Sequence, residues 1–542
     1  MSATWGTIDL PGPAPAPDAT LDRLADEVQC VCVQPIDVLQ VAALLETAGI
    51  TDNSAMLRYG HVSVFDLAES VTRRITPQPA VSSAAALTPA APELRWQAAM
   101  DYLRGPLTLL PMVLLSAVIM VYQSYGEWSS AQVLAFSLSV VTSLLVTSGF
   151  VQAASRKGSS YLSQGYIVAA RRIVSIIMGA GLLAACIVGG ALVAAVLRYL
   201  APPTEVVVTM GVSFLVLSCL WLAAGVLFLL GQVIWFGLGL AVGVTLIAAV
   251  LHGLTAWVGE RSWAMLAATF VGFSGALAVM YLAARRTLAR RAALSPVSSQ
   301  AVVLPATPHL LVNLAPYFAY GVLYVVLVLS GHISGWLGAA PGGAGRMMAV
   351  TATEVGLTIA LGGVILAGGV AERTVARFWR LIKSYQLKVS PAQPAEFSRL
   401  IQTFFRREIL RYGVVLALCS ALVAALLLIF QAATSGRGAT ILPWTAETQF
   451  IMALGLVGYG IMALGVFQCM FLITLSRPGM ATEAVVIGIA CTLIVGALAG
   501  QLTYYPYSAL GVVCGSLAFA LAARRNLQQV LRQVDYYYYA SF

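Results

Sequence analysis

The sequence predicts an all-α, polytopic membrane protein with about twelve transmembrane helices in two six-helix lobes, preceded by a small helical N-terminal module in the cytoplasm. Three observations predict this fold class. Of the 542 residues, 59% are hydrophobic and only 10% are charged, against about 25% charged in an average soluble domain. The mean hydropathy is +0.86. The apolar residues are gathered in runs of about 18–25, which is long enough to span a bilayer.

Residues 1–100 are predicted to form a cytoplasmic helical module with linkers rich in Pro and Ala. The segments with linker composition are 10–20 and 77–92. Two helices are expected between them, one over 36–45 and one over 64–75, the latter begun by Ser63 as its N-cap. About 60 residues make only a marginal core, so we expect this module to dock on the membrane part or on a partner.

The spanning helices are expected where the apolar runs lie. These are 106–124, 132–154, 173–197, 206–230, 233–253, 263–284, 310–332, 347–370, 412–432, 448–474, 480–501 and 505–523. The run from 206 to 253 is nearly unbroken, and Gly231-Gln232 is its only turn signal. That dipeptide therefore predicts the division between the fourth and fifth spans.

The basic residues support this map and give it an orientation. With the N-terminus in the cytoplasm, 27 of the 31 Lys and Arg residues fall on inside segments and 4 on outside segments. Cytoplasmic loops carry such an excess, so both termini are predicted to be cytoplasmic, in a multi-pass protein of the inner or plasma membrane. The net charge of +9 then indicates contact with anionic membrane lipid and not with nucleic acid.

The two halves of the membrane part resemble each other. The first lobe is expected over 104–284 and the second over 310–523, with a cytoplasmic linker over 285–309 and a cytoplasmic tail over 524–542. In each half, the loop after the second helix is the basic, amphipathic one. Two halves that enter from the same side imply a pseudo-twofold axis along the membrane normal, which is typical of transporters with a central cavity.

Residue patterns typical of enzymes are missing from the sequence. It has no Walker loop, and the predicted outside segments hold few acids. The 8 Cys and 4 His residues have no zinc or haem spacing. We therefore expect no enzymatic activity, no cofactor and no metal site.

The helix expected over 310–332 carries the candidate residues of the substrate cavity. They are Asn313, Tyr317, Tyr320 and Tyr324, whose spacings of four, three and four put them on one face. Pro316 can loosen the inner turn, and Gly321 allows a close helix approach. Aromatic hydroxyls on one face suit sugar rings; an interfacial aromatic belt with ordinary helix packing is the alternative.

Glu354 is the acid that this map puts well inside a span. A carboxylate in the membrane is costly and is by default a functional candidate, so Glu354 is the candidate coupling site for a proton or another cation. The alternative is a carboxylate near the outer end that is hydrogen-bonded to a neighbour or hydrated. His332, near the outer end of the preceding helix, is more typical of a satisfied interfacial histidine than of a proton switch.

The segment 372–411 alternates Arg and Lys with Phe, Trp and Leu. The favoured interpretation is a pair of interfacial amphipathic helices on anionic lipid. The other is a cytoplasmic mouth that gathers an anionic, pyrophosphate-linked glycolipid. The residues that would form this mouth are Arg373, Arg377, Arg380 and Lys383.

Two stretches, APYFAYGVLYVVLVLSGHISGW (315–336) and TEVGLTIALGGVILAGGVAER (353–373), resemble the multidrug/oligosaccharidyl-lipid/polysaccharide exporter superfamily. Within it, the PelG-like exopolysaccharide transporter family is most similar, and the Phe- and Arg-rich segment that follows and the Asp-Tyr ending also resemble that group. Ser330-Gly331-His332 departs from the charged, Asp-containing helix end expected there. The resemblance implies a two-lobed transporter that exports exopolysaccharide or flips a lipid-linked sugar precursor by alternating access.

Two other functions stay open at this point. The chain could be a cation-coupled small-molecule exporter, although RKGSSYLSQG (156–165) lacks the acid of the major facilitator signature. It could also be a membrane scaffold subunit of a polysaccharide synthase. The expected partners are membrane lipid and a lipid-linked sugar or polysaccharide, with polysaccharide synthase or glycosyltransferase components as further candidates.

Overall fold

The computed structural model of the chain is built from helices throughout its described part, which confirms the predicted all-α membrane fold. It describes residues 17–31, 38–47, 50–75, 102–103, 105–107, 130–163, 166–199, 202–255, 261–294, 307–338, 344–386, 394–434 and 445–533. The chain divides into two compact units. One contains Met1–Leu94 and Ala376–Thr403, and the other contains Arg95–Val375 and Phe404–Phe542.

The N-terminal part of the first unit is a small helical module. Its elements are α1 (Pro17–Val31), α2 (Val38–Thr47), α3 (Asp52–Ser54), the π-helical turn η1 (Ala55–Tyr59) and α4 (Val64–Arg74). As predicted, Ser63 is the N-cap of α4, and its Oγ accepts a hydrogen bond from the Asp66 backbone N–H at 3.2 Å. Leu67 and Val71 of α4 are fully buried in the module's core.

Helix α1 corrects the prediction that residues 10–20 form a linker. It begins at Pro17, so the end of that segment is helical. Proline is well tolerated in the first turn of a helix, and Leu21, Leu24 and Val28 bring one apolar face into the core. The local Pro and Ala composition concealed a helix whose stability comes from packing.

Eleven described helices are long and apolar enough to cross a membrane. The first lobe contains α7 (Ser130–Ser163), α8 (Ile167–Tyr199), α9 (Thr204–Leu229), α10 (Val233–Thr255) and α11 (Arg261–Leu294). The span predicted over 106–124 lies almost entirely outside the described residues. The predicted break at Gly231 is confirmed, because α9 ends before it and the residue has a φ of 70°, a left-handed conformation that glycine adopts readily.

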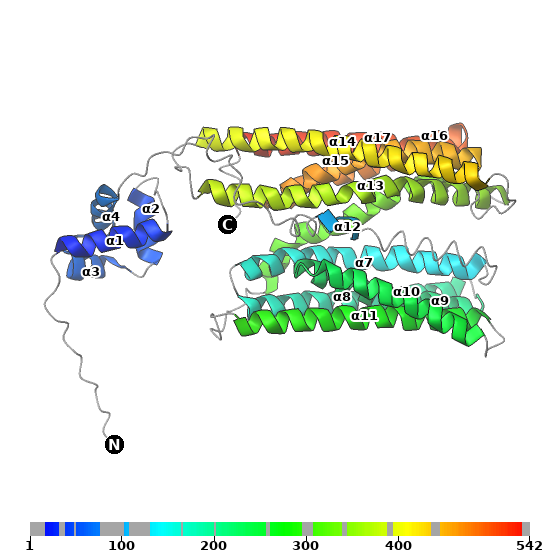
Figure 1. Cartoon of the computed structure of the whole chain (residues 1–542), viewed down its shortest axis with the longest axis horizontal. Coiled ribbons are helices and arrows are strands. Elements are labelled where there is room, and N and C mark those ends of the chain that lie inside the picture. The colour runs from blue at the N-terminus through cyan, green and yellow to red at the C-terminus, as the bar shows by residue number, and fades with distance from the viewer. Residues whose placement is uncertain are drawn as a thin grey trace, which may run out of the picture. The chain divides into compact units, whose positions relative to one another are not determined.

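The second lobe begins with α12 and continues to the end of the described chain. Its helices are α12 (Thr307–Gly338), α13 (Ala344–Gln386), α14 (Pro394–Thr434), α15 (Ala446–Thr474), α16 (Pro478–Leu502), the 3₁₀ turn η2 (Tyr505–Ser508) and α17 (Ala509–Arg532). Figure 1 shows α12 between the helices of the first lobe and the other helices of the second. It packs against both α7 and α16.

Helices α13 and α14 are much longer than predicted. The basic segment 372–411 does not form a separate pair of helices in its described part; it continues the two spanning helices. At 1.5 Å per residue, the 43 residues of α13 reach about 65 Å, roughly twice the thickness of hydrocarbon. Hydropathy marked where the apolar part ended, not where the helix ended.

Small residues bring helices into close contact within the second unit. A Cβ on Gly321 of α12 would lie 2.7 Å from the backbone oxygen of Ser148 in α7, which confirms the close approach predicted at this glycine. A Cβ on Gly511 of α17 would lie 2.5 Å from Cα of Gly496 in α16. Both contacts need glycine, and the first holds the two lobes together beside the main cavity.

Candidate functional site

The main cavity lies between the two lobes and has a volume of about 510 Å³. Helices α7, α9 and α10 line it from the first lobe, and α12, α13, α14 and α15 line it from the second. This size is typical of sites for small molecules and cofactors. The walls are mainly apolar, and their polar groups come from a few Ser, Thr, Gln and Tyr residues and one Glu.

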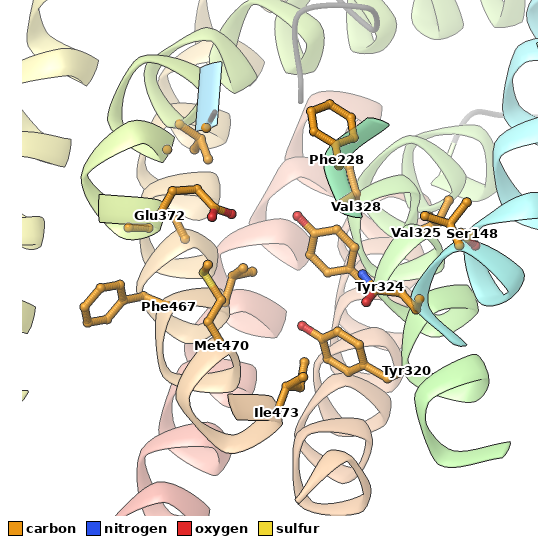
Figure 2. Close-up of a pocket in the computed structure, with 18 of the residues that line it drawn as sticks. Ser148, Phe228, Tyr320, Tyr324, Val325, Val328, Glu372, Phe467, Met470 and Ile473 are labelled. Carbon is orange, nitrogen blue, oxygen red and sulfur yellow. The ribbon is translucent and has the colours of Figure 1, made fainter. Parts of the chain in front are cut away.

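An aromatic wall runs along α12. Tyr320 and Tyr324 line the cavity, and their rings stack with centroids 6.1 Å apart and planes 17° from parallel. Figure 2 shows both hydroxyls directed toward the side of the cavity where Glu372 and Met470 lie. Tyr412 of α14 also lines the cavity, and its ring stacks on that of Phe467 with the two centroids 4.8 Å apart. Flat rings with hydroxyl edges can bind a ring-shaped ligand by stacking and by hydrogen bonds at its rim.

Glu372 is the one charged side chain among the described residues that line the cavity. Figure 2 shows its carboxylate turned toward Tyr324. The sequence map missed this residue because the apolar run was taken to end at residue 370, whereas α13 continues to Gln386. Neither Lys, Arg nor His contributes to the described lining, so the cavity carries acidic and neutral groups only.

The four residues predicted for the cavity occupy different positions. Tyr320 and Tyr324 line it, whereas Asn313 and Tyr317 are not among its lining residues. Asn313 is exposed, and the ring of Tyr317 lies under the guanidinium of Arg156, with Cζ 5.4 Å from the ring centroid. The helical face is continuous, but α12 leaves the cavity before it reaches residue 317.

Glu354 forms a polar cluster with two residues of α12, beyond the cavity. Its Oε2 lies 3.0 Å from Nδ1 of His332, and its Oε1 accepts a hydrogen bond of 2.9 Å from Nε1 of Trp336. Nδ1 of His332 is buried and is not aligned for a hydrogen bond, so this is a close contact between a carboxylate and an imidazole. His332 follows the cavity residue Leu329 by three positions, which puts the cluster about one helical turn beyond the cavity.

The residues predicted for a cytoplasmic mouth follow Glu372 along α13. Arg373 is exposed, and Arg377 and Arg380 are half-buried. Lys383 lies on the same helix, but its side chain is outside the described part of the structure. Their common role at a mouth stays a prediction.

Several cavity residues had no signal of their own in the sequence. Gln152 of α7 and Trp221 of α9 line the cavity from the first lobe. Nε1 of Trp221 donates a hydrogen bond of 3.2 Å to Oγ of Ser143, so the indole is fixed in place. Their helices are apolar on most sides, and only the packing of the lobes reveals which side faces the cavity.

Comparisons with known proteins identify the class of fold. No protein-family model matches the sequence, and no curated protein matches it significantly. Solved structures do match. A point mutant of the MATE transporter VcmN from Vibrio cholerae has a TM-score of 0.56 and 16% identity, over 82% of this chain and 97% of that one. A point mutant described as MATE has a TM-score of 0.54 and 12% identity, over 84% and 100%.

A transporter of the MOP superfamily from Pyrococcus furiosus also matches, with a TM-score of 0.50 and 12% identity over 81% of this chain and 96% of that one. The chain therefore has the fold of the MATE transporters. This agrees with the resemblance to the exporter superfamily at the level of fold. At these identities, the likeness extends to architecture and not to substrate.

Proposed function

We propose that this chain is a membrane transporter that works by alternating access between its two lobes. The observation that carries this proposal is the cavity between the lobes, which helices of both lobes line. The lobes meet beside this cavity in the close contact of α7 and α12. The shared fold with MATE transporters supports the same function. In this proposal, the protein lies in the plasma membrane with both termini in the cytoplasm.

The proposed substrate is an exopolysaccharide or its lipid-linked sugar precursor, as in the PelG-like family. The stacked rings of Tyr320 and Tyr324 support a saccharide, because sugar rings stack on aromatic faces while their hydroxyls bond at the edge. The described lining has no basic side chain, which favours uncharged or positively charged sugar units inside the cavity. The lipid and any phosphate would then remain outside it.

A strain that lacks the protein tests this proposal. Surface polysaccharide and lipid-linked precursor are measured in that strain after complementation with wild type, Tyr324→Ala or Tyr199→Ala. The last variant is the matched control, because Tyr199 is 84% exposed at the end of α8. We expect Tyr324→Ala to lower surface polymer and to raise intracellular precursor, and Tyr199→Ala to behave as wild type. Unchanged polymer in the deletion strain would refute the saccharide proposal.

Glu354 is the proposed coupling residue. Its carboxylate lies 3.0 Å from the buried Nδ1 of His332, so two groups that can each take up a proton lie next to each other. We expect Glu354→Gln to abolish export while the protein still folds. Glu205→Gln, in the first turn of α9, is the matched control. Near-normal export by Glu354→Gln, at the same protein level as wild type, would remove the coupling role.

A second candidate function is a cation-coupled small-molecule exporter. The specific observation in its favour is Glu372, which is the single charge in the described lining and suits an organic cation. Uptake of a fluorescent organic cation into inside-out vesicles separates the two candidates. Uptake that Glu372→Gln abolishes, together with normal surface polymer in the deletion strain, would favour the small-molecule exporter.

A further inference from the structure

Arg156 makes a polar contact between the lobes at one end of the cavity. Its side chain extends from α7, and its Nη2 donates to Oγ of Ser476, which lies in the turn between α15 and α16. Its guanidinium also lies over the ring of Tyr317 in α12, with Cζ 5.4 Å from the centroid. One cation therefore connects the first lobe to two elements of the second.

This contact lies immediately beyond the cavity on all three elements. Gln152, Tyr320 and Thr474 line the cavity. Arg156 follows Gln152 by four positions, Tyr317 precedes Tyr320 by three, and Ser476 follows Thr474 by two. On a helix, three or four positions are one turn along the same face. In the predicted topology, the C-terminal ends of α7 and α15 and the N-terminal end of α12 all face the cytoplasm. The contact thus lies at the predicted cytoplasmic end of the cavity.

The contacts of Arg156 in the described part of the structure are with neutral groups. Ser476 offers a hydroxyl and Tyr317 offers a ring face, and a half-buried guanidinium between them keeps most of its five donors for other acceptors. Arginine often binds phosphate in a bidentate manner, through charge-assisted hydrogen bonds that are about twice as strong as neutral ones. A phosphate that reached this position would displace Ser476.

The backbone of Ser476 is an independent sign of function. It has a φ of 59°, and it is the only residue other than glycine with a positive φ in the described part of the chain. Such a conformation is costly for a residue with a side chain, and strain of this kind gathers at functional sites. Glycine would fit the turn more easily, but it could not reach Arg156.

We propose that Arg156, Tyr317 and Ser476 form a gate at the cytoplasmic end of the cavity, and that the phosphate group of a lipid-linked sugar opens it by binding Arg156. The phosphate takes the place of the Ser476 hydroxyl, the turn between α15 and α16 is released, and the sugar enters the cavity beside Tyr320. This deepens the proposed function, on which it rests, because it assigns a phosphate-bearing substrate.

Binding of two matched lipids tests the phosphate site. The full chain is purified in a maltoside detergent and titrated with a polyprenyl phosphate and with the polyprenol of the same length. Wild type should bind the phosphate lipid about tenfold more tightly or better, as one charge-assisted bond implies. Arg156→Gln should bind both lipids equally, and Arg156→Lys should keep part of the preference.

The matched control is Lys157→Gln, which removes the same charge one residue away. The Lys157 ammonium lies 5.7 Å from the ring centroid of Tyr161, a residue of the same helix α7. This variant should keep the preference for the phosphate lipid. A preference that survives in Arg156→Gln, or that Lys157→Gln loses as completely, would overturn the phosphate site.

Hydrogen exchange of residues 472–479 tests the gate itself. The phosphate lipid should raise exchange there severalfold in wild type, whereas the polyprenol should not. Ser476→Gly should raise exchange without any lipid, although it relieves the backbone strain. Slower or unchanged exchange in Ser476→Gly would overturn the gate. If export still depends on Tyr324 while the phosphate preference is absent, this inference fails and the proposed function stands.

Discussion

Replacing Gly321 with alanine should push the two lobes apart beside the cavity. The new methyl carbon would lie 2.7 Å from the backbone oxygen of Ser148 and 2.7 Å from Cγ of Gln152. The Gln152 side chain can move, but the Ser148 oxygen belongs to the backbone of α7. The clash is therefore relieved only by a shift of α7 against α12, and both helices line the cavity.

The magnitude follows from the cost of overpacking. Inserting one methyl group into a close contact typically costs about 1–3 kcal/mol. If the contact exists only in the present conformation, the equilibrium between conformations shifts by roughly 5- to 150-fold, since about 1.4 kcal/mol is a factor of ten. A transporter that must form this contact in every cycle would be slowed by up to the same factor.

Hydrogen exchange and export measure this effect together. Exchange should rise in the stretch of α7 from Ser148 to Arg156, and export should fall. Gly190→Ala is the control, because a Cβ there meets nothing within 4 Å. Any effect of this variant measures the higher helix propensity of alanine alone. If Gly321→Ala leaves both exchange and export at wild-type values, the α7–α12 contact does not hold the present conformation.

Three further predictions concern stability. Gly511→Ala should cost about 1–3 kcal/mol in thermal unfolding, because its methyl would meet α16, whereas Gly179→Ala should cost nothing. Trp336→Phe removes the indole donor to the half-exposed Glu354 and should cost about 1 kcal/mol, measured in the same way. The Val62 N–H and His61 hold the pKa of the Asp66 carboxyl below its usual 3.8. The ionised carboxylate therefore stabilises the folded module at pH values above the pKa that Asp66 has in the unfolded chain. This stabilisation is lost as the pH falls through the lower pKa of the folded state. Acid unfolding of the N-terminal module should therefore begin at a higher pH in Asp66→Asn than in wild type. The same onset pH in both proteins would contradict a stabilising role of Asp66.

The sequence predicted the spans but not the length of every helix. Hydropathy ended the eighth span at residue 370 and began the ninth at 412, whereas α13 continues to Gln386 and α14 starts at Pro394. Hydropathy follows the thickness of the hydrocarbon, and a backbone whose Arg and Lys side chains are good helix formers continues beyond it. Glu372 and Tyr412 lie at these two misjudged boundaries, and both line the cavity.

Contacts between distant segments were beyond the reach of sequence patterns. Glu354 and His332 each had features that drew attention to them, but their separation of 3.0 Å depends on how α12 and α13 are rotated about their axes. Arg156 and Ser476 are 320 positions apart in the chain. No sequence pattern gave a reason to select Ser476, because its positive φ arises from a turn and serine is not a residue that predicts this conformation.

The proposed gate and the proposed coupling cluster lie at opposite ends of one helix. Tyr317 and His332, both of α12, are 15 positions apart, which is about 22 Å along a helix. Tyr320 and Tyr324, which line the cavity, stand between them. A largely rigid α12 that tilts to open one end of the cavity must move its other end as well. Displacing Ser476 from Arg156 would then disturb the pair of His332 and Glu354, so substrate at one end and a proton at the other would act on the same element. Alternating access needs such a connection, and α12 can provide it because it packs against helices of both lobes.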